Sequence, residues 1–309
     1  MSHIYDTLII GGGPAGYTAA LYASRAGLDT LVVERMSAGG QIALTEIVDN
    51  YPGFAAGIDG WSLGMQMQQG AERFGAKTQY AEVTALKLDK PVKEVITSEG
   101  TILTRTLMIA TGANPRPLGV AREKELTGRG VHYCATCDGM FYRGKTVIVV
   151  GGGNTAVEDV TVLARIAKKV ILVHRRDTLR ATKVYLEHLN NLDNVEFRWN
   201  SEVAEILEDE KVVGARLKNL VTGEVSDVEA DGIFVSIGRA PATWLVKDLV
   251  ELDRGGYIVA DETTRTSVPG VYAVGDVRTK EVRQVVTAVA DGAVAVHYAE
   301  GYLADFPKE

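Results

Sequence analysis

Residues 7–35 read TLIIGGGPAGYTAALYASRAGLDTLVVER, and residues 147–176 read VIVVGGGNTAVEDVTVLARIAKKVILVHRR. Each stretch begins with a β-branched run, passes through three consecutive glycines into a helical pattern, and ends with a second β-branched run. A strand, a helix and a parallel strand joined in this way need about 30 residues. The chain therefore contains the same unit twice, and we predict an α/β fold built on parallel sheets.

Both units carry the same pattern of small residues where the helix begins: Gly11-x-Gly13-x-x-Gly16 and Gly151-x-Gly153-x-x-Ala156. The first glycine permits a tight turn, the second lets the backbone approach a pyrophosphate, and the small third residue lets the helix pack on the strand. Free N–H groups at the helix N-terminus attract phosphate. One such pattern also suits a plain strand–turn–helix, but two in the right context predict two Rossmann-like three-layer nucleotide-binding domains.

The two units differ at the end of their second strand, where nucleotides are distinguished. The first ends with Glu34, whose carboxylate can accept a hydrogen bond from a ribose 2′-hydroxyl. The second ends with His174, Arg175 and Arg176, followed by Arg180, and guanidinium groups pair with a 2′-phosphate that a carboxylate would repel. A solvated charge run is the alternative. Since a flavin and a nicotinamide are the usual combination, we predict FAD in the first unit and NADPH in the second.

Two proline-containing segments separate the second unit from the rest of the chain. The stretch LMIATGA at 107–113 is followed by Asn114–Pro117, and a similar strand is followed by Gly238–Pro241. Prolines at these places stop regular structure. We predict that one domain is inserted into the other, since the joints of an inserted domain lie close together on a surface. The predicted FAD-binding domain comprises residues 1–116 and 240–309, and the predicted NADPH-binding domain comprises residues 117–239.

The C-terminal part of the chain is expected to return to the first domain. Val271–Val274 predicts a short strand, and Gly275 and Asp276 follow it as a turn. A helix is expected to begin near Gln284 and to include Val285–Tyr298. A helix N-terminus after a strand is again favourable for an anion.

The only cysteines of the chain, Cys134 and Cys137, lie in the segment VHYCATCDGM at 131–140. Their spacing permits a disulfide, and one thiol of such a motif is often a nucleophilic thiolate. Asp138 follows directly and can transfer a proton. A structural zinc site needs four ligands, and His132 would be only the third beside the two cysteines. A purely structural disulfide is unusual in a reducing compartment. Inert buried cysteines do not suit this turn sequence. We predict a redox-active pair, with His132 as a loop residue.

Composition and charge exclude several other classes of protein. The net charge of −7 and the pI near 5.4 provide no overall basic surface for nucleic acid. Two close cysteines do not make the framework of a small secreted protein. No segment approaches the roughly 20 apolar residues that span a bilayer. The N-terminus shows no targeting pattern, and we expect a cytoplasmic protein without a metal.

Taken together, these motifs resemble the low-molecular-weight thioredoxin reductases. The series CATCDG, GGGNTA and HRRD is specific in this order, whereas each motif alone is not. The resemblance extends over nearly the whole chain through GGGPAGYTAA near the start, GGQI at 39–42, NYPGF at 50–54, ATGA at 110–113, SIGRAP at 236–241 and GVYAVGDV at 270–277. The family implies a homodimeric enzyme that transfers electrons from NADPH through FAD to a cysteine pair and then to thioredoxin.

The resemblance also implies which residues form the sites. Those expected to hold FAD are Gly11, Gly13, Pro14, Ala15, Gly16, Glu34, Gly40, Gln41, Asn50, Thr111, Gly112, Ala113, Gly275, Asp276, Arg283 and Gln284. Those expected to hold NADPH are Gly151, Gly153, Asn154, Thr155, Ala156, His174, Arg175, Arg176 and Arg180, with Gly238 and Arg239 as further cofactor contacts. Cys137 is expected to exchange electrons with the flavin, Cys134 to attack the disulfide of thioredoxin, and Asp138 to act as general acid.

The cysteine pair and the predicted NADPH site lie in the same inserted domain, and both must reach one flavin. We hypothesise that this domain rotates as a rigid body on the segments 114–117 and 238–241. Two other functions remain open from the residues. One is the reduction of a related acceptor, such as a glutaredoxin-like or peroxidase-coupled protein, or the use of electrons from ferredoxin. The other is a flavin-binding redox sensor without turnover.

Overall fold

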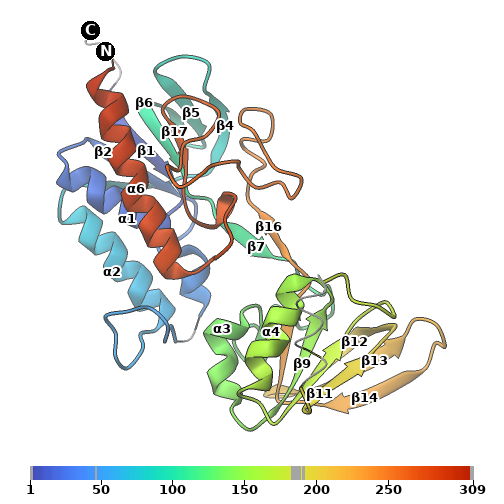
Figure 1. The fold of residues 1–309 in the computed structure, drawn as a ribbon. Coiled ribbons are helices and arrows are strands. Elements are labelled where there is room, and N and C mark those ends of the chain that lie inside the picture. Colours follow the sequence, from blue (N-terminus) through green and yellow to red (C-terminus); the bar gives the residue numbers. More distant parts are fainter. Residues whose placement is uncertain (1–2, 46, 182–188, 190–191, 307–309) are drawn as a thin grey trace. The chain divides into compact units, whose positions relative to one another are not determined.

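The computed structural model describes residues 3–45, 47–181, 189 and 192–306 of the 309-residue chain (Figure 1). The chain divides into two compact units. The first unit consists of Met1–Asn114 and Ala240–Glu309, and the second of Pro115–Arg239. Each unit has its own sheets and its own hydrophobic clusters, so each is described by itself.

A seven-stranded sheet forms the centre of the first unit. Its strands follow the order β3-β2-β1-β6-β5-β4, and β17 pairs with β6. Strand β1 is parallel to β2 and to β6, whereas β4 and β5 are antiparallel additions at one edge. The strands are β1 (Ile4–Ile10), β2 (Thr30–Glu34), β3 (Lys77–Tyr80), β4 (Val83–Lys87), β5 (Lys93–Thr97), β6 (Gly100–Ile109) and β17 (Val271–Ala273).

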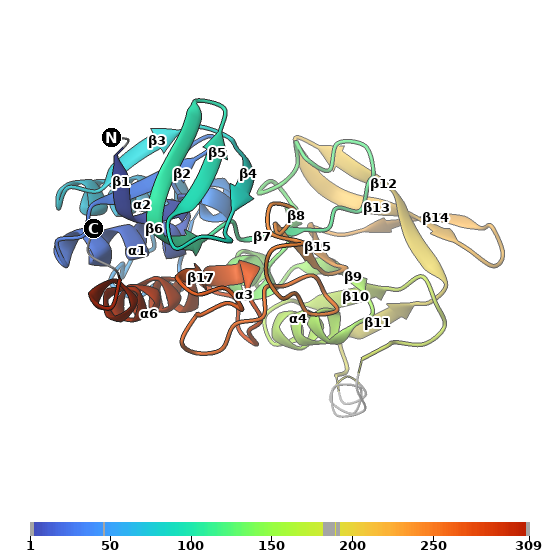
Figure 2. The same ribbon diagram turned by 90° about the horizontal axis from the view of Figure 1, so that it is seen from above.

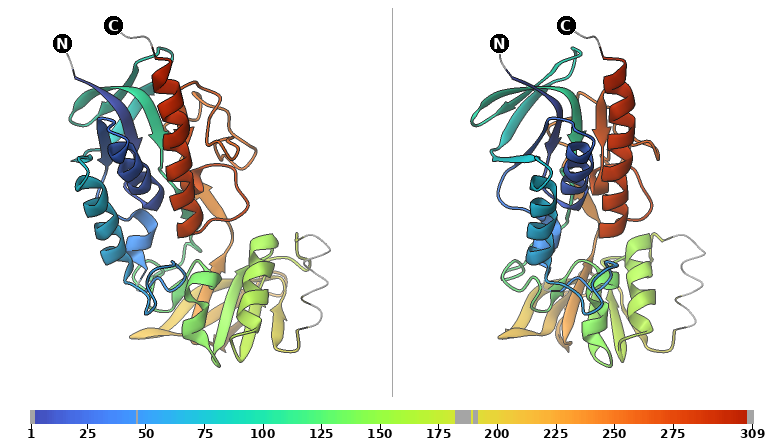
Figure 3. Two further views of the ribbon diagram at one scale, coloured as in Figure 1. Left: turned by 60° about the vertical axis from the view of Figure 1, so that its left-hand side comes forward. Right: turned by 90° about the vertical axis from the view of Figure 1, so that its left-hand side faces the viewer.

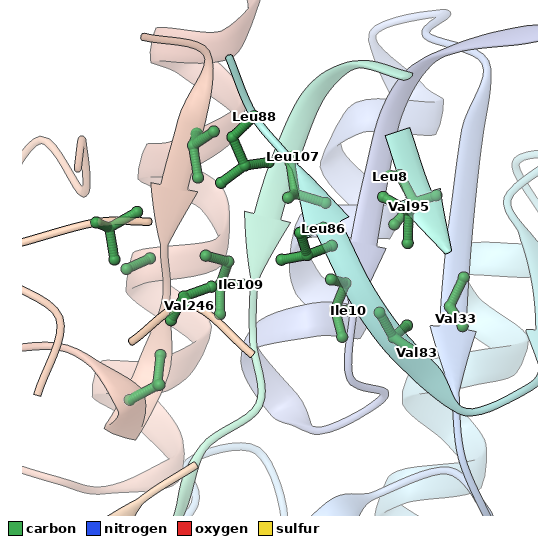
Figure 4. Packing of buried hydrophobic residues seen from close by; sticks show 14 of the residues in the cluster. Leu8, Ile10, Val33, Val83, Leu86, Leu88, Val95, Leu107, Ile109 and Val246 are labelled. Carbon is green, nitrogen blue, oxygen red and sulfur yellow. The ribbon is translucent and has the colours of Figure 1, made fainter. Parts of the chain in front are cut away.

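The two faces of this sheet are covered by different layers, because successive side chains of a strand point to opposite faces. Ile9 packs among the small side chains of the helices, which are α1 (Pro14–Arg25), α2 (Gly60–Glu72) and α6 (Val285–Ala304). Figure 3 shows these helices side by side. Leu8 and Ile10 point to the other face, where they meet Val83, Leu86 and other residues that Figure 4 labels.

A five-stranded, fully parallel sheet forms the centre of the second unit, in the order β11-β10-β9-β15-β8. A three-stranded antiparallel sheet, β12-β13-β14, accompanies it and is visible in Figure 2. The elements are β8 (Val131–His132), α3 (Ala135–Asp138), the 3₁₀ helix η2 (Gly139–Tyr142), β9 (Thr146–Gly151), α4 (Asn154–Ala164), β10 (Lys169–Val173), β11 (Val195–Arg198), β12 (Ser201–Asp209), β13 (Lys211–Asn219), β14 (Val225–Glu229) and β15 (Gly232–Ser236).

The second unit repeats the layering of the first. Val147 and Val149 of β9 face α4 and pack against its buried Val160 and Leu163. Ile148 points to the opposite face, in the cluster that contains the buried side chains of β12 and β13. In each unit, helices cover one face of the parallel strands, and antiparallel strands cover the other face. The predicted fold class of two Rossmann-like three-layer domains is confirmed.

Two short strands lie where the chain passes between the units. β7 (Ala113–Pro115) pairs with β16 (Arg239–Pro241) in a two-stranded sheet, and the N–H of Arg116 donates to the carbonyl of Gly238 at 3.0 Å. The expectation that prolines stop regular structure here was wrong. A two-stranded ribbon leaves one edge of each strand without a neighbour, and proline is tolerated there because its missing N–H is not needed.

The C-terminal helix begins where the sequence indicates. Gln284 is the N-cap of α6, and it forms a capping box with Thr287. The helix continues to Ala304, beyond the predicted stretch. Among the described residues, no helix combines the length and the apolar character needed to cross a membrane.

Candidate functional site

The glycine turn of the first unit has room for a ligand at one position only. Gly11 has a φ of +107°, which favours glycine, and a Cβ on Gly16 would collide with the carbonyl oxygen of Gly11. Gly13 is different, because its φ is −82° and an added Cβ would meet nothing nearer than the carbonyl oxygen of Gly39, at 4.0 Å. The fold does not need glycine there. The space lies at the N-terminus of α1, which has no side-chain cap, and it suits a pyrophosphate.

The second unit repeats this arrangement. A Cβ on Gly151 would collide with the carbonyl oxygen of Ser236, and Ala156 is fully buried beneath the turn. Gly153 is the N-cap of α4, has no side-chain cap, and has nothing within 4 Å of an added Cβ. Asn154 and Thr155 follow as the exposed first residues of α4. The residues of both turns therefore fit the dinucleotides that the sequence predicts.

Glu34 is bound to the glycine turn of its own unit. Its Oε2 atom accepts a hydrogen bond from the N–H of Gly12 at 2.6 Å, and Oε1 accepts from the N–H of Met36 at 3.0 Å. The carboxylate is thus fixed at the end of β2, next to the turn that begins α1. Pro14 and Ala15 form the first turn of α1.

The positive charges of the second unit lie just after β10. The ring of His174 is buried against Gly152, and burial together with the neighbouring arginines lowers its pKa. Arg175, Arg176 and Arg180 are exposed, and none of the three pairs with an acid in the part of the chain that the structure describes. The N–H of Arg180 donates to the carbonyl of Gly152 at 2.7 Å, which places this arginine beside the glycine turn.

The fold brings together several of the other residues predicted to hold FAD. Gln41, in the 3₁₀ helix η1 (Gly40–Leu44), donates to Asn114 at 2.9 Å. Asn50 donates to Gln284 at 3.0 Å, across 234 positions of sequence. Thr111 donates to the carbonyl of Ala242 at 2.8 Å. The carbonyl of Gly112 accepts from the N–H of Ala242 at 3.0 Å, and Ala113 is buried.

A buried ion cluster supports the turn that contains Gly275 and Asp276, and the sequence did not indicate it. The turn is the 3₁₀ helix η3 (Gly275–Val277). The carboxylate of Asp291 accepts from the N–H of Gly275 at 2.8 Å, from Arg278 at 2.9 and 3.0 Å, and from Lys280 at 2.8 Å. Hydrogen bonds from these groups hold the pKa of Asp291 below its ordinary value despite its burial. Arg283 donates to the carbonyls of Asp276 and Arg278, at 3.4 and 3.2 Å.

Cys134 and Cys137 are joined as a disulfide. Cys134 is the N-cap of α3, and Cys137 lies inside this single helical turn. Both residues are partly exposed, so they are not inert members of the core. Met140 and Phe141 follow in η2 with exposed side chains. The arrangement is that of an oxidised dithiol that another molecule can reach.

Asp138 belongs to a buried hydrogen-bonded chain. Its Oδ2 atom lies 2.9 Å from Nδ1 of His132, whose Nε2 lies 2.7 Å from the hydroxyl of Tyr142. The ring of His132 also stacks on Phe234. Burial raises the pKa of the Tyr142 hydroxyl, so this group stays a hydrogen-bond donor. The expectation that His132 is a loop residue was wrong, since it ends β8 and is buried.

Two further contacts hold the segment around the disulfide, and the sequence did not indicate them. Tyr133 donates from its hydroxyl to the buried Glu123 at 2.8 Å, and its carbonyl accepts from Arg239 at 3.5 Å. Asp159 of α4 accepts a hydrogen bond from the hydroxyl of Ser236 at 2.5 Å. Burial raises the pKa of Asp159 to about 6.

Gly238, a further predicted cofactor contact, lies just after β15 and has a φ of +103°.

Comparisons with known proteins identify the family. The chain matches the pyridine nucleotide-disulphide oxidoreductases over residues 5–292. It is 48% identical over 301 residues to the thioredoxin reductase of Listeria monocytogenes, with 97% of this chain and 94% of that protein covered. It is 46% identical over 303 residues to the thioredoxin reductase of Mycolicibacterium smegmatis, with 98% and 97% covered. The crystal structure of thioredoxin reductase from Streptococcus pyogenes is 44% identical and has a TM-score of 0.93, with 99% and 100% covered.

These similarities span both glycine turns and the cysteine pair, and they confirm the resemblance that the motifs gave. Thioredoxin reductases of this family are FAD- and NADPH-dependent flavoproteins. The chain therefore belongs to the pyridine nucleotide-disulphide oxidoreductases and, within them, to the thioredoxin reductases.

Proposed function

We propose that this protein is an NADPH-dependent thioredoxin-disulfide reductase. The observation that carries the proposal is the accessible Cys134–Cys137 disulfide, which lies in the same compact unit as a glycine turn flanked by exposed arginines. The other unit supplies a second glycine turn with open space above its helix. Bound FAD would supply the two-electron relay between NADPH and the disulfide.

The residues around the first glycine turn are proposed to hold FAD. Gly13 and the N-terminus of α1 receive the pyrophosphate, and Glu34 accepts from a ribose hydroxyl. The buried Asp291 keeps the turn of Gly275 and Asp276 in place. The other proposed contacts are Gly11, Pro14, Ala15, Gly16, Gly40, Gln41, Asn50, Thr111, Gly112, Ala113, Arg283 and Gln284.

The residues around the second glycine turn are proposed to hold NADPH. Gly153 and the N-terminus of α4 receive its pyrophosphate, and the exposed guanidinium groups of Arg175, Arg176 and Arg180 pair with its 2′-phosphate. His174 is buried and packs on Gly152, so it shapes this pocket as a neutral ring. The other proposed contacts are Gly151, Asn154, Thr155, Ala156, Gly238 and Arg239.

The cysteines and Asp138 are proposed to carry out the exchange with thioredoxin. Two electrons and two protons convert the Cys134–Cys137 disulfide into two thiols. The Cys134 thiolate then attacks the disulfide of thioredoxin, forming a mixed disulfide and releasing one thioredoxin sulfur. Cys137 attacks Cys134, which restores the internal disulfide and releases the second thioredoxin sulfur. Asp138, held by His132, supplies or receives the proton that accompanies these steps.

The two connections between the units support a proposed rotation. The disulfide and the arginines belong to Pro115–Arg239, whereas the FAD contacts belong to the other unit. We propose that β7 and β16 are the hinges on which the inserted unit turns between two orientations, one for each electron transfer. We further propose that the protein is a homodimer and works in the cytoplasm.

Reduction of thioredoxin by the purified, FAD-loaded protein tests the function. We expect NADPH to drive the appearance of two thiols per thioredoxin, measured with a thiol reagent. NADH, oxidised glutathione and oxidised glutaredoxin serve as the comparisons for donor and acceptor. Turnover with glutaredoxin but none with thioredoxin would show that the acceptor is a glutaredoxin and would contradict the proposed acceptor. Flavin reduction by NADPH without turnover on any disulfide would favour a sensor and contradict the proposal.

A further inference from the structure

Tyr133, the residue directly before Cys134, faces the side of the parallel sheet opposite to that of His132. Successive residues of an extended chain point to opposite faces. The ring of His132 stacks on Phe234, which belongs to the hydrophobic cluster beneath α4. Tyr133 instead packs against the cluster that contains the buried side chains of β12 and β13. The backbone that leads into the disulfide is therefore held from both faces of the sheet.

The hydroxyl of Tyr133 has a fixed and buried acceptor. It donates to Oε1 of Glu123 at 2.8 Å, and Glu123 is only 5% exposed. The same carboxylate accepts from the backbone N–H groups of Leu118 at 2.7 Å and Gly119 at 2.9 Å. A buried carboxylate is costly unless hydrogen bonds satisfy it, and here three donors do so. Because the backbone holds the carboxylate in place, the Tyr133 side chain has one defined direction.

These contacts link Tyr133 to the chain beside both connecting strands. Leu118 and Gly119, which Glu123 holds, follow shortly after β7 ends at Pro115. Arg239, the first residue of β16, donates to the carbonyl of Tyr133 at 3.5 Å. The residue next to the disulfide is therefore bonded through its side chain to the segment after β7 and through its backbone to β16.

The hydroxyl is the part of Tyr133 that packing does not explain. Phenylalanine would fill the same space against the apolar cluster, so the hydroxyl is present for its hydrogen bond. Burial and the carboxylate of Glu123 raise the pKa of this hydroxyl, so the group stays protonated and remains a donor.

We propose that Tyr133 is a positioning residue of the redox centre and that Glu123 is its anchor. The hydrogen bond between them fixes the backbone that enters Cys134, the N-cap of α3, and so keeps Cys134 where its sulfur can join that of Cys137. The effect passes through the peptide bond between Tyr133 and Cys134. This inference rests on the proposed function, because it assigns Tyr133 a part in dithiol–disulfide exchange.

A double-mutant cycle with a matched control separates this role from a general effect on folding. Tyr133→Phe removes only the hydroxyl, Glu123→Gln weakens the acceptor by removing its charge, and the double variant combines the two changes. Tyr80→Phe is the control, since it removes a tyrosine hydroxyl that contacts Gln68 in the other unit. Circular dichroism and the thermal midpoint show whether each variant is folded.

The first measurement is the equilibrium between each FAD-loaded protein and dithiothreitol, followed by counting free thiols. The reaction converts the Cys134–Cys137 disulfide and reduced dithiothreitol into the dithiol and oxidised dithiothreitol. Loss of the anchor should make the disulfide easier to reduce, and we expect Tyr133→Phe to raise the equilibrium constant about three- to tenfold. We expect Tyr80→Phe to stay within about twofold of the wild type.

The double variant tests whether the hydroxyl acts through Glu123. Both single changes affect the same hydrogen bond, so the shift of the double variant should be smaller than the product of the two single shifts. A shift equal to that product would show that the two residues act independently and would overturn the proposal. A wild-type equilibrium in Tyr133→Phe would overturn it as well.

The second measurement is steady-state reduction of thioredoxin by the same proteins. We expect Tyr133→Phe to lower kcat about five- to tenfold with little change in KM, while stopped-flow reduction of the flavin by NADPH keeps its wild-type rate. Wild-type kinetics in Tyr133→Phe would overturn the proposal while leaving the proposed function intact. If the wild type itself fails to reduce thioredoxin, the proposed function falls. The dithiothreitol equilibrium, which needs no thioredoxin, would still decide whether Tyr133 positions the cysteine pair.

Discussion

The Nδ1 atom of His132 lies 2.9 Å from Oδ2 of Asp138, and both side chains are largely enclosed. The ring is held from its other side by Tyr142 and Phe234, so it fixes the position of the carboxyl group next to Cys137. A proton donor acts efficiently only when it is held within reach of the reacting atom. His132 is therefore expected to matter for catalysis even though it does not touch the substrate.

Replacing His132 by phenylalanine tests this relationship. The variant keeps the aromatic packing on Phe234 but removes the bond to Asp138, so we expect thioredoxin turnover to fall about 10- to 100-fold. Flavin reduction by NADPH, followed by stopped-flow absorbance, should be unchanged. Tyr142→Phe, which removes only the outer hydrogen bond, should have a smaller effect. Full turnover in His132→Phe would show that Asp138 does not depend on this partner.

The two glycines of the first turn should respond differently to the same substitution. Gly16→Ala places a methyl group against the carbonyl of Gly11, and such overpacking costs about 1–3 kcal/mol of folding stability or more. Gly13→Ala meets no neighbour and has an allowed φ, so the flavin-free protein should lose about 1 kcal/mol or less. FAD affinity should nevertheless fall at least about tenfold in Gly13→Ala. Thermal midpoints of the flavin-free proteins measure the effect on stability, and FAD titrations measure the effect on binding. Unchanged FAD affinity in Gly13→Ala would contradict the proposal that the pyrophosphate binds at Gly13.

The arginines after β10 should determine the preference for NADPH. Removing both Arg175 and Arg176 takes two guanidinium groups from the proposed 2′-phosphate site, so we expect kcat/KM for NADPH to fall about 10- to 100-fold. The value for NADH should stay nearly the same, because NADH lacks the phosphate. Lys168→Ala removes an exposed cation before the start of β10 and serves as the control. Equal losses for NADPH and NADH would place the arginines outside the phosphate site.

Asp159 should leave a signature in the pH dependence of stability. Burial raises its pKa from 3.8 to about 6, so the folded protein binds this proton more tightly than the unfolded chain. The stability that this carboxyl contributes is complete below about pH 4 and is lost as the pH rises through about 6. Asparagine does not titrate, so the stability of Asp159→Asn relative to the wild type should increase over that interval by on the order of 2 kcal/mol. Chemical denaturation at several pH values measures it, and a constant difference from pH 4 to 7 would contradict the raised pKa.

The fold could be predicted from the sequence because its signals are local. The three glycines, the β-branched runs beside them and the spacing of Cys134 and Cys137 each specify a short piece of structure. The layers then follow from the alternation of strand side chains, as Leu8, Ile9 and Ile10 show. The prolines of the connecting segments misled the prediction, because a two-stranded ribbon tolerates a residue that a central strand does not.

The missed residues depend on contacts between segments that are distant in sequence. Asp159 and Ser236 form a hydrogen bond across 77 positions of sequence, and Tyr133 and Arg239 form one across 106 positions. Neither pair has a local sequence pattern that would predict the contact. The strand of His132, β8, is only two residues long, which is too short for a periodic signal in the sequence. Asp291 lies within the helix that the sequence predicts, and no local pattern indicates that its carboxylate accepts from the N–H of Gly275, 16 positions away.

The most direct test of the central claim is a single-turnover experiment with Cys134→Ser. The claim is that electrons from NADPH reach thioredoxin only through the Cys134–Cys137 pair. We predict that NADPH reduces the flavin of the variant as fast as that of the wild type, while no thiols appear on thioredoxin. Thioredoxin reduction by Cys134→Ser at the wild-type rate would contradict the account.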